Sequence, residues 1–195
     1  MKKLVVASEN KGKLKEIREI LKDKYEVVSM GEMGFSEEIV EDGETFYENA
    51  LKKAQTVSKA LGCDALADDS GLCVDALGGA PGVYSARYAG GHGDDKANRD
   101  LLLKNLQGEN NRRAYFESAI ALVYPDGREF VANGRTYGNI LQEEQGEGGF
   151  GYDCIFESEN LKKSFGLASP EEKNSVSHRF RALMKLKELL GEVSK

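Results

Sequence analysis

Short apolar runs alternate with amphipathic stretches near the start of this sequence, and this alternation most constrains the fold. Residues 3–7 and 25–30 have the length and composition of short strands. Between them, residues 13–23 carry Leu14, Ile17 and Leu21 at the spacing of a helix face. Strands that alternate with helices favour a sheet covered by helices rather than an all-β or an all-α protein.

The later elements are predicted from helix caps and turns. Thr45 and Glu48 form a capping-box pattern that begins a helix reaching about Leu61, and Ser169-Pro170-Glu171-Glu172 begins another. Two long strands are expected on either side of the turn Pro125-Asp126-Gly127. These two strands are 113–124 and 128–140. The other predicted segments are strands at 65–67 and 72–77 and helices at 94–106 and after His178. Together they predict an α/β fold with a mixed sheet flanked by helices.

The composition bounds the class of protein. A chain of 195 residues is long enough for one domain, 1–195, with a substantial core. The net charge of −6 argues against a nucleic-acid partner, which wants a basic face. The apolar stretch Leu4–Ala7 is too short for a signal peptide, and no run approaches a membrane span. We therefore expect a cytoplasmic protein without a membrane partner.

The metal-binding residue types are few. Cys63, Cys73 and Cys154 are scattered and odd in number, which suggests neither a disulfide framework nor a zinc site. With only His92 and His178, a histidine-rich cluster is also excluded. Any metal is therefore expected to be a hard cation held by carboxylates.

The segment 8–13 lies between the first predicted strand and the first predicted helix. Backbone amides at a helix start attract anions, Ser8 and Asn10 can donate hydrogen bonds, and Lys13 adds a positive charge. The segment is a candidate phosphate site, with a capped and solvated turn as the alternative. Because Glu9 would repel a phosphate, we expect its side chain to point away.

Asp68 and Asp69 are adjacent carboxylates between two apolar runs, an arrangement that is costly unless water, a partner or a cation meets them. Neighbours on an extended chain face opposite ways, so one acid can serve a site and the other the scaffold. The functional interpretation is a Mg²⁺ ligand or a base that activates water. The alternative is an acidic turn reversed at Gly71. Glu41, from the acidic segment 38–44, would complete a magnesium site if it reached Asp69.

Two later segments carry candidate ligand contacts. Residues 148–153 combine glycines, which permit close approach of the backbone, with aromatic rings for stacking. The alternative is a strand entry whose aromatic residues belong to the core. Lys173 and the group Ser177-His178-Arg179 stand near the last helices, where their donors could meet an oxo group on a base. The alternative for them is a capped helix start with surface charge.

Taken in order, these segments resemble the inosine triphosphate pyrophosphatase family. The shared motifs are S-x-N-x-x-K at 8–13, E-D-G-E-T-F-Y-E-N-A at 41–50, A-D-D-S-G-L at 67–72, G-G-A-P-G-V-Y-S-A-R-Y at 78–88, G-G-F-G-Y-D at 148–153 and S-H-R at 177–179. Each motif alone is weak, but the ordered set covers nearly the whole chain and is highly specific.

The resemblance implies an elongated α/β fold with a mixed β-sheet flanked by helices, in two lobes with a central active-site cleft. It also implies a homodimer and a Mg²⁺ cofactor. The family's partners are purine nucleoside triphosphates. The implied reaction hydrolyses non-standard ones (ITP, dITP and XTP) to the monophosphate and pyrophosphate, which removes them from the nucleotide pool.

Roles at the matching positions are implied as well. Glu41 and Asp69 would bind Mg²⁺, and Asp69 would also accept the proton of the attacking water. The residues that would contact the nucleotide are Ser8, Asn10, Lys11, Lys13, Lys53, Ser70, Phe150, Gly151, Tyr152, Asp153, Lys173, His178 and Arg179.

The chemistry of the bases gives a reason for such selectivity. Hypoxanthine and xanthine present an oxo acceptor at C6, whereas adenine presents an amino donor. A site built from donors such as His178 or Arg179 leaves groups unpaired when adenine enters, which rejects it strongly. Guanine shares the oxo group, so it must be excluded through its 2-amino group.

Three other functions share some of these features. A pyrophosphatase of the septum-formation nucleotide-binding family would act on other modified or pyrimidine nucleotides, and the complete motifs at 148–153 and 177–179 argue against it. A nucleotide sensor without turnover would not need a base at Asp69. An RNA-binding protein that stacks bases on Phe150 and Tyr152 would want a basic groove, which an acidic chain does not suggest.

Overall fold

The computed structural model describes residues 1–191, which form a seven-stranded sheet with helices against it. The strands are β1 (Lys2–Val6), β2 (Tyr25–Ser29), β3 (Ala65–Val74), β4 (Arg113–Val123), β5 (Glu129–Ile140), β6 (Phe156–Ser158) and β7 (Lys163–Ser164). Their order is β2-β1-β3-β4-β5-β6-β7. β1 pairs in parallel with β2 and β3, whereas β6 pairs antiparallel with β5 and β7. The predicted α/β fold with a mixed sheet is confirmed.

The helices are α1 (Lys11–Leu21), α2 (Phe46–Leu61), α3 (Asp95–Asn105), α4 (Pro170–Val176) and α5 (His178–Leu189), with short 3-10 helices at Asp75–Leu77, Gly82–Arg87 and Asp153–Ile155. The chain divides into two compact units, and each combines separate segments. Unit 1 comprises residues 1–69, 118–134 and the chain from Arg179 onward, and unit 2 comprises 70–117 and 135–178.

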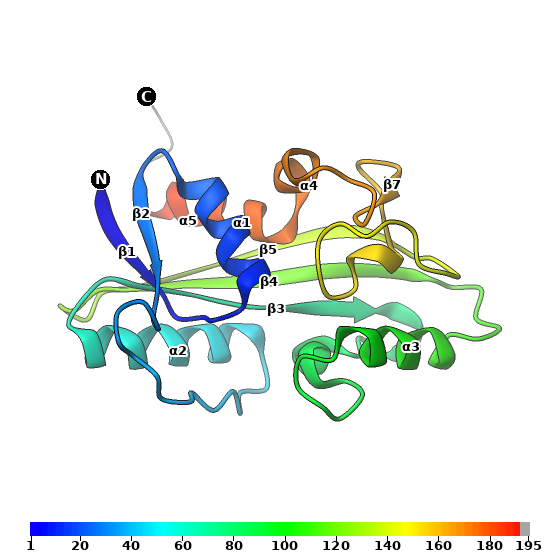
Figure 1. Ribbon diagram of the computed structural model, residues 1–195, viewed down its shortest axis with the longest axis horizontal. Helices are drawn as coiled ribbons and strands as arrows, with labels where there is room; N and C mark the ends of the chain where they lie inside the picture. The colour runs from blue at the N-terminus through cyan, green and yellow to red at the C-terminus, as the bar shows by residue number, and fades with distance from the viewer. Residues whose placement is uncertain (192–195) are drawn as a thin grey trace. The chain divides into compact units, whose positions relative to one another are not determined.

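Unit 1 has its own apolar core. α1 and α5 cover one face of its strands, and α2 covers the other (Figure 1). Val6 and Leu66 from the sheet pack with Ile17 and Leu183 from the helices, and all four are at most 2% exposed. In β1, Leu4 pairs in register with Val27 of β2. The apolar spacing of the first helix therefore faces the sheet as predicted.

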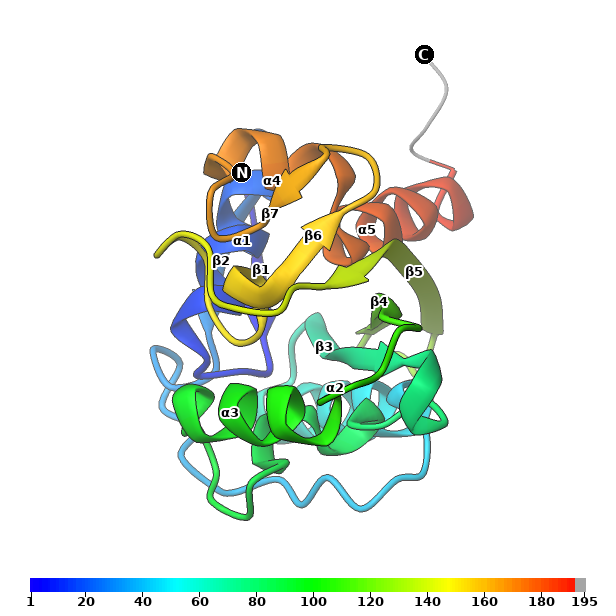
Figure 2. The same ribbon diagram turned by 90° about the vertical axis from the view of Figure 1, so that its right-hand side faces the viewer.

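Unit 2 is built around aromatic residues. α3 lies on one side of its strands and α4 on the other (Figure 2). The rings of Phe116 and Phe156 lie 4.6 Å apart, and Phe165 stacks on Phe116 at 6.2 Å. Leu72, Leu102 and other apolar side chains enclose this group.

One part of the strand prediction is wrong. The sequence indicated two short strands at 65–67 and 72–77, with an acidic turn reversed at Gly71 as one interpretation of the residues between them, but β3 is a single ten-residue strand that runs through these positions. Nine of its ten residues are buried, and both aspartates lie within it. Burial and pairing of the carboxylates outweigh the low strand preference of Asp and Gly.

The predicted caps hold with one change. Ser169 and Glu172 form the complete capping box of α4, with Pro170 at its first turn. Thr45 caps α2 by accepting from the Glu48 amide, but the Glu48 carboxylate accepts from the Glu44 amide at 2.7 Å instead of completing the box. No helix in the described part of the chain is long and apolar enough to cross a membrane.

Candidate active site

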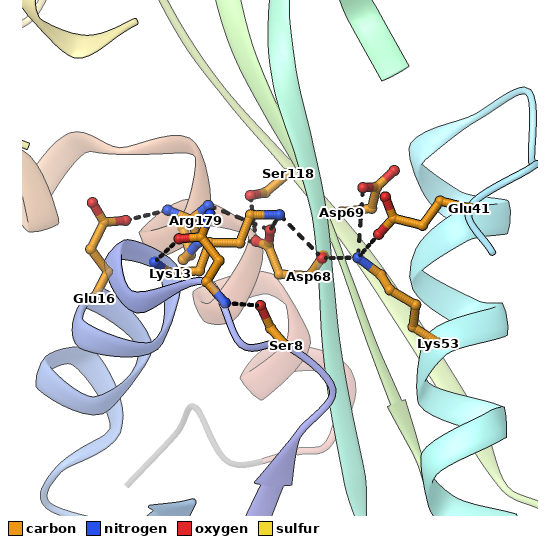
Figure 3. Close-up of polar contacts among 10 residues, drawn as sticks. Ser8, Lys13, Glu16, Glu41, Lys53, Asp68, Asp69, Ser118 and Arg179 are labelled. Atoms are coloured by element: carbon orange, nitrogen blue, oxygen red, sulfur yellow. Dashed lines mark hydrogen bonds and ion pairs between the residues drawn. The ribbon is translucent and has the colours of Figure 1, made fainter. Parts of the chain in front are cut away.

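β3 places Asp68 and Asp69 on opposite faces of one strand. Because successive side chains of a strand point to opposite faces, the two carboxylates enter different surroundings. Figure 3 shows Asp68 directed toward Lys13 and Arg179, and Asp69 directed toward Lys53. Both faces belong to unit 1 at this point.

The carboxylate of Asp68 is fully buried and surrounded by donors. Arg179 Nε donates to Oδ2 at 3.0 Å, and Ser118 Oγ donates to the same oxygen at 2.8 Å. Lys13 Nζ lies 3.0 Å from Oδ1. Behind this group, the Glu16 carboxylate of α1 accepts from Arg179 Nη1 (Figure 3). The buried charges are therefore paired and hydrogen bonded, the condition under which a protein interior tolerates them.

The pKa of Asp68 reflects this enclosure. Burial alone would raise the pKa of the carboxyl, but the charges of Arg179 and Lys13 and their hydrogen bonds hold it well below its usual range. Burial would lower the pKa of Arg179, yet Asp68 and Glu16 raise it. Asp68 is therefore an ionised counter-ion inside the scaffold.

Arg179 has partners that the sequence did not predict. We expected it to contact the nucleotide, but its side chain is 1% exposed and its guanidinium contacts Asp68 and Glu16. These partners lie 111 and 163 residues away in the sequence, so no local pattern reveals them. In this structure the guanidinium holds the Asp68 carboxylate.

On the other face, Asp69 lies beside the Lys53 ammonium. Lys53 Nζ lies 3.7 Å from Asp69 Oδ1 and 2.6 Å from Glu41 Oε1. The same nitrogen donates to the carbonyl oxygen of Asp68 at 2.7 Å. Asp69 is 6% exposed, and its Oδ2 is buried without a hydrogen-bond partner among residues 1–191. A buried carboxylate oxygen in that condition is costly unless a ligand meets it.

The pKa of Asp69 is raised, in contrast to that of its neighbour. Burial is the largest cause, and the negative charges of Glu41 and Asp68 add to it. Lys53 and Lys13 act in the opposite direction but do not cancel the shift. A carboxylate with a raised pKa is a stronger base than an ordinary aspartate, which suits a group that removes a proton from water.

Glu41 reaches this place because α2 anchors the segment that carries it. Asn49, 2% exposed, accepts a hydrogen bond from the Gly43 amide at 2.8 Å. A Cβ at Gly43 would lie 2.7 Å from Asn49 Oδ1, so this close approach requires glycine. Lys52 adds an exposed ion pair to Asp42 at 2.7 Å. These contacts hold the chain directly after Glu41 against the helix.

Glu41 and Asp69 together offer carboxylate oxygens, the ligands that hard cations prefer. Within the described residues, no group of three or more His, Cys, Asp or Glu side chains could hold a metal. Mg²⁺ commonly uses one or two carboxylates and takes its other ligands from water and phosphate oxygens. The buried, unpartnered Oδ2 of Asp69 fits a site shared in this way.

The segment 8–13 forms the turn that begins α1. Asn10 caps the helix, since its Oδ1 accepts from the Lys13 amide at 3.0 Å. Ser8 Oγ accepts from the Asn10 amide at 3.1 Å, and Lys11 is exposed. The Lys13 ammonium reaches across to β3, where it pairs with Asp68. The segment is thus a capped helix start with a lysine on its inner side.

The Glu9 side chain is directed to the segment that follows β2. Its carboxylate accepts from the Gly31 amide at 2.6 Å. A Cβ at Gly31 would meet Glu9 Oε1 at 2.7 Å, so the two segments are closely packed there. The negative charge is therefore held against the chain after β2.

Unit 2 contains a second buried polar group, formed by Lys173, Asp153 and Phe150. Lys173 Nζ lies 2.6 Å from Asp153 Oδ2 and 4.7 Å from the centre of the Phe150 ring. The same Asp153 oxygen accepts from the Phe150 amide at 3.0 Å. Lys173 and Asp153 are both buried. The alternative of ordinary surface charge is wrong for Lys173.

His178 and Tyr152 are buried in the same unit. The His178 ring stacks on Phe116, with centroids 4.9 Å apart and planes 16° apart. The Tyr152 hydroxyl donates to the Ser85 carbonyl oxygen at 2.7 Å, and its ring packs in the apolar core. Burial raises the pKa of Tyr152, so the hydroxyl stays protonated as a donor. Tyr152 therefore has the core position that the sequence left open as an alternative.

The turn around Gly151 is fixed by α3. The Gly151 amide donates to Asp95 Oδ2 at 3.0 Å, and its carbonyl oxygen accepts from Arg99 Nη1 at 2.8 Å. Ser70, the remaining predicted contact, is half-buried on β3.

Several polar residues of these clusters were not singled out from the sequence. They are Glu16, Ser118, Asn49, Asp95 and Arg99. Glu16 lies off the helix stripe formed by Leu14, Ile17 and Leu21, so no spacing indicates its burial. Lys53 differs, because it falls on the same stripe of α2 as the buried Ala50. A lysine on an apolar stripe signals a buried partner.

The sequence has close relatives. Residues 4–189 match the Ham1 family. A dITP/XTP pyrophosphatase of Desulforamulus reducens is 51% identical over 98% of this chain and 96% of its own length. A dITP/XTP pyrophosphatase of Bacillus subtilis is 47% identical over 97% of this chain and 98% of its own length.

Solved structures agree with these matches. The Ham1 protein of Staphylococcus aureus superposes with a TM-score of 0.87 at 41% identity, covering 99% of this chain and all of that one. A Ham1 protein of Coxiella burnetii gives the same TM-score at 38% identity, with the same coverage. The ordered motifs and these matches lead to one conclusion: the chain belongs to the Ham1 family.

Proposed function

We propose that this protein hydrolyses dITP, XTP and ITP to the nucleoside monophosphate and pyrophosphate in a Mg²⁺-dependent reaction. Relatives that match the chain nearly from end to end carry dITP/XTP pyrophosphatase in their names. One observation carries the catalytic part of the proposal. Asp69 is a buried carboxylate with one unpartnered oxygen, beside an ammonium and a second carboxylate.

The reaction sets clear requirements. A water oxygen forms a bond to the α-phosphorus, and pyrophosphate leaves with the electron pair of the broken α–β phosphoanhydride bond. The water must lose a proton, the phosphate charge must be neutralised, and the nucleotide must be held in line. Asp69 is the group that takes the proton. Its burial and its lack of a competing donor among residues 1–191 both support this role.

The phosphates need positive charge and hydrogen-bond donors. Glu41 and Asp69 would hold Mg²⁺, which when bound neutralises phosphate charge and improves the leaving group. Lys53 supplies a charge from α2, and Lys13 supplies another from α1, since both ammonium groups reach the Asp68 carbonyl oxygen, at 2.7 and 3.4 Å. The first turn of α1, capped by Asn10, adds the donors of a helix start.

We assign recognition of the base to His178 as its principal donor. Of the two candidate donors His178 and Arg179, we choose His178 because the nitrogen atoms of Arg179 contact Asp68 and Glu16. The His178 ring is held flat on Phe116, which fixes the plane in which its nitrogen atoms lie. The buried pair of Lys173 and Asp153 offers further polar atoms near Phe150.

Substitution of the histidine tests this assignment. His178→Ala is expected to lower the ratio of kcat/KM for ITP over ATP at least tenfold, since it removes a donor that adenine cannot use. The measurement is the ratio of the two constants, with circular dichroism as the control for folding. An unchanged ratio in a folded variant would remove His178 from base recognition.

The main test is pyrophosphate release from dITP, XTP, ITP, ATP and GTP, with Mg²⁺ and with EDTA. We expect release in Mg²⁺ that is largely confined to the first three nucleotides and absent in EDTA. Release from all five would leave the hydrolysis standing and overturn the assignment of base selectivity. Binding of ITP without release would indicate a nucleotide sensor and overturn the role of Asp69.

The homodimer and the cytoplasmic location stay predictions from the sequence. Sedimentation equilibrium of the purified chain tests the first through its mass. A fluorescent fusion in growing cells tests the second.

A further inference from the structure

Lys53 lies between the two carboxylates proposed to hold Mg²⁺. Its Nζ is 2.6 Å from Glu41 Oε1 and 3.7 Å from Asp69 Oδ1. It also donates to the Asp68 carbonyl oxygen at 2.7 Å. An ammonium has three N–H donors, and here three oxygen atoms from different residues surround it (Figure 3). Two of these oxygen atoms lie within hydrogen-bond distance of the ammonium, and Asp69 Oδ1 lies at ion-pair distance.

The position of this ammonium is built into the fold. The Lys53 side chain is 9% exposed and lies on the buried stripe of α2 with Ala50, Ala54 and Val57. One of its acceptors is a main-chain oxygen of β3, which moves only with the strand. A buried lysine in such surroundings is part of the site, unlike a surface lysine that pairs with whatever charge is near.

The charges around Lys53 disfavour a lone divalent cation. Glu41 and Asp69 carry two negative charges, and Lys53 cancels one of them. A metal ion that enters without nucleotide must break the pair with Glu41 or accept a neighbouring positive charge. The metal ion and the Lys53 ammonium would repel each other more strongly in a poorly solvated site than in water.

Phosphate groups change this balance. They bring negative charge that can bind the ammonium, and they bring oxygen ligands for the metal. Lys53 can then exchange its carboxylate partners for phosphate oxygens, and the two carboxylates become available to the metal.

We propose that Lys53 is a built-in counter-cation that closes the Glu41–Asp69 pair to lone divalent cations, so that the metal enters together with the phosphates of the nucleotide. The proposal rests on the Mg²⁺-dependent function proposed above and adds an order of binding to it. In the protein without nucleotide, the Lys53 ammonium supplies the positive charge that the metal would otherwise bring to the two carboxylates. Removal of its ammonium opens the pair to the metal alone.

The test is a titration of Mn²⁺ into nucleotide-free protein, in which the electron paramagnetic resonance signal of unbound Mn²⁺ measures the bound fraction. Lys53→Met keeps the length of the side chain and removes its charge. We expect this variant to bind Mn²⁺ at least tenfold more tightly than the wild type, about 1.4 kcal/mol. A folded Lys53→Met protein that binds Mn²⁺ no more tightly than the wild type would overturn the proposal.

Two control variants locate the effect. Lys52→Met removes the same charge from the next residue of α2, where Lys52 pairs with the exposed Asp42. Its Mn²⁺ affinity is expected to stay within twofold of the wild type, and an equal gain would reduce the effect to net charge and contradict the proposal. The double variant Glu41→Gln with Lys53→Met is expected to lose the gain, because one carboxylate of the pair is gone.

A measurement on the wild type covers the case in which Lys53→Met does not fold. The Lys53 ammonium is followed by ¹⁵N nuclear magnetic resonance in protein with ¹⁵N-labelled lysine. Mg²⁺ alone is expected to leave this signal unchanged, whereas Mg²⁺ with an inosine triphosphate analogue carrying a methylene between its α- and β-phosphorus atoms shifts it. A shift of equal size with Mg²⁺ alone would show that the pair is open and overturn the proposal.

These outcomes are separate from those of the main function. Tight Mn²⁺ binding by the nucleotide-free wild type would refute the role of Lys53 and leave the pyrophosphatase assignment intact. Absence of Mg²⁺-dependent pyrophosphate release by the wild type would refute the function itself.

Discussion

Asp68 and Asp69 are the same residue type, adjacent in β3 and both buried, yet the partners of their carboxylates differ on the two faces of the strand. Asp68 has two cations and a hydroxyl around its carboxylate, and its pKa is lowered. Asp69 has one ammonium at 3.7 Å and an oxygen without a partner in the described chain, and its pKa is raised. The two carboxylates are nearly equally buried, so the opposite shifts of their pKa values come from the different numbers of donors around them.

The comparison separates a structural carboxylate from a reactive one. A carboxylate whose lone pairs are all engaged is a poor base and a poor ligand, and it holds neighbouring elements together. A buried carboxylate with an oxygen in reserve costs stability, but it can accept a proton or bind a ligand. β3 carries one of each because a strand sends neighbours to opposite faces.

The largest expected effect is on turnover, from Asp69→Asn. Loss of the proton acceptor is expected to lower kcat about 10²- to 10⁴-fold, the usual contribution of a positioned general base. ITP binding, measured by calorimetry, should remain detectable. Little stability is expected to be lost, because the amide removes a buried charge that is poorly compensated. A variant with wild-type kcat would remove Asp69 from the role of base.

Asp68→Asn is expected to lower the stability of the protein far more than Asp69→Asn does. It removes the negative charge from between Arg179 and Lys13, and a buried ion pair broken on one side costs about 3–5 kcal/mol. Glu16 still compensates part of the Arg179 charge, so we expect about 3 kcal/mol in urea denaturation. If this variant were as stable as Asp69→Asn, the two faces would not differ in the way described.

Acid pH sharpens the same contrast. Because the pKa of Asp68 is lower in the folded chain than in the unfolded one, its contribution is fully present above the unfolded value of about 3.9. It is lost as the pH falls through the folded value. The stability difference between the wild type and Asp68→Asn is therefore expected to shrink below about pH 4. Urea midpoints at a series of pH values measure it, and a constant difference would contradict the lowered pKa.

The sequence predicted much of the fold because its signals are local. The cap at Ser169, the hairpin turn at 125–127 and the apolar spacing of α1 each depend on residues a few positions apart. The motifs also led to Glu41, Lys53 and Asp69, which the structure brings together.

The rest depended on distant contacts. The role of Arg179 follows from residues 111 and 163 positions away, and the Asp68–Gly71 segment became strand because buried partners compensated its acids. Propensity favoured a turn there, and tertiary pairing outweighed it. The face on which each aspartate lies was likewise settled by the continuous strand, which the sequence had divided in two.

The smallest expected effect, from Ser118→Ala, tests whether Asp68 is charged and enclosed as described. Ser118 Oγ donates to Asp68 Oδ2 at 2.8 Å, and a buried hydrogen bond to a charged group contributes about 1.5–3 kcal/mol. Because Arg179 and Lys13 remain, we expect a loss of stability near the lower end, about 1.5 kcal/mol, with kcat unchanged.

Ser58→Ala is the matched control, since Ser58 is as buried and donates at the same 2.8 Å to the neutral Cys63 carbonyl oxygen. A neutral bond contributes about 1 kcal/mol, so the serine facing Asp68 should be the costlier of the two to remove. Equal losses of stability would mean that the hydrogen bond from Ser118 stabilises the Asp68 carboxylate no more than an ordinary bond stabilises a neutral carbonyl group. The two cations alone would then account for the lowered pKa of Asp68.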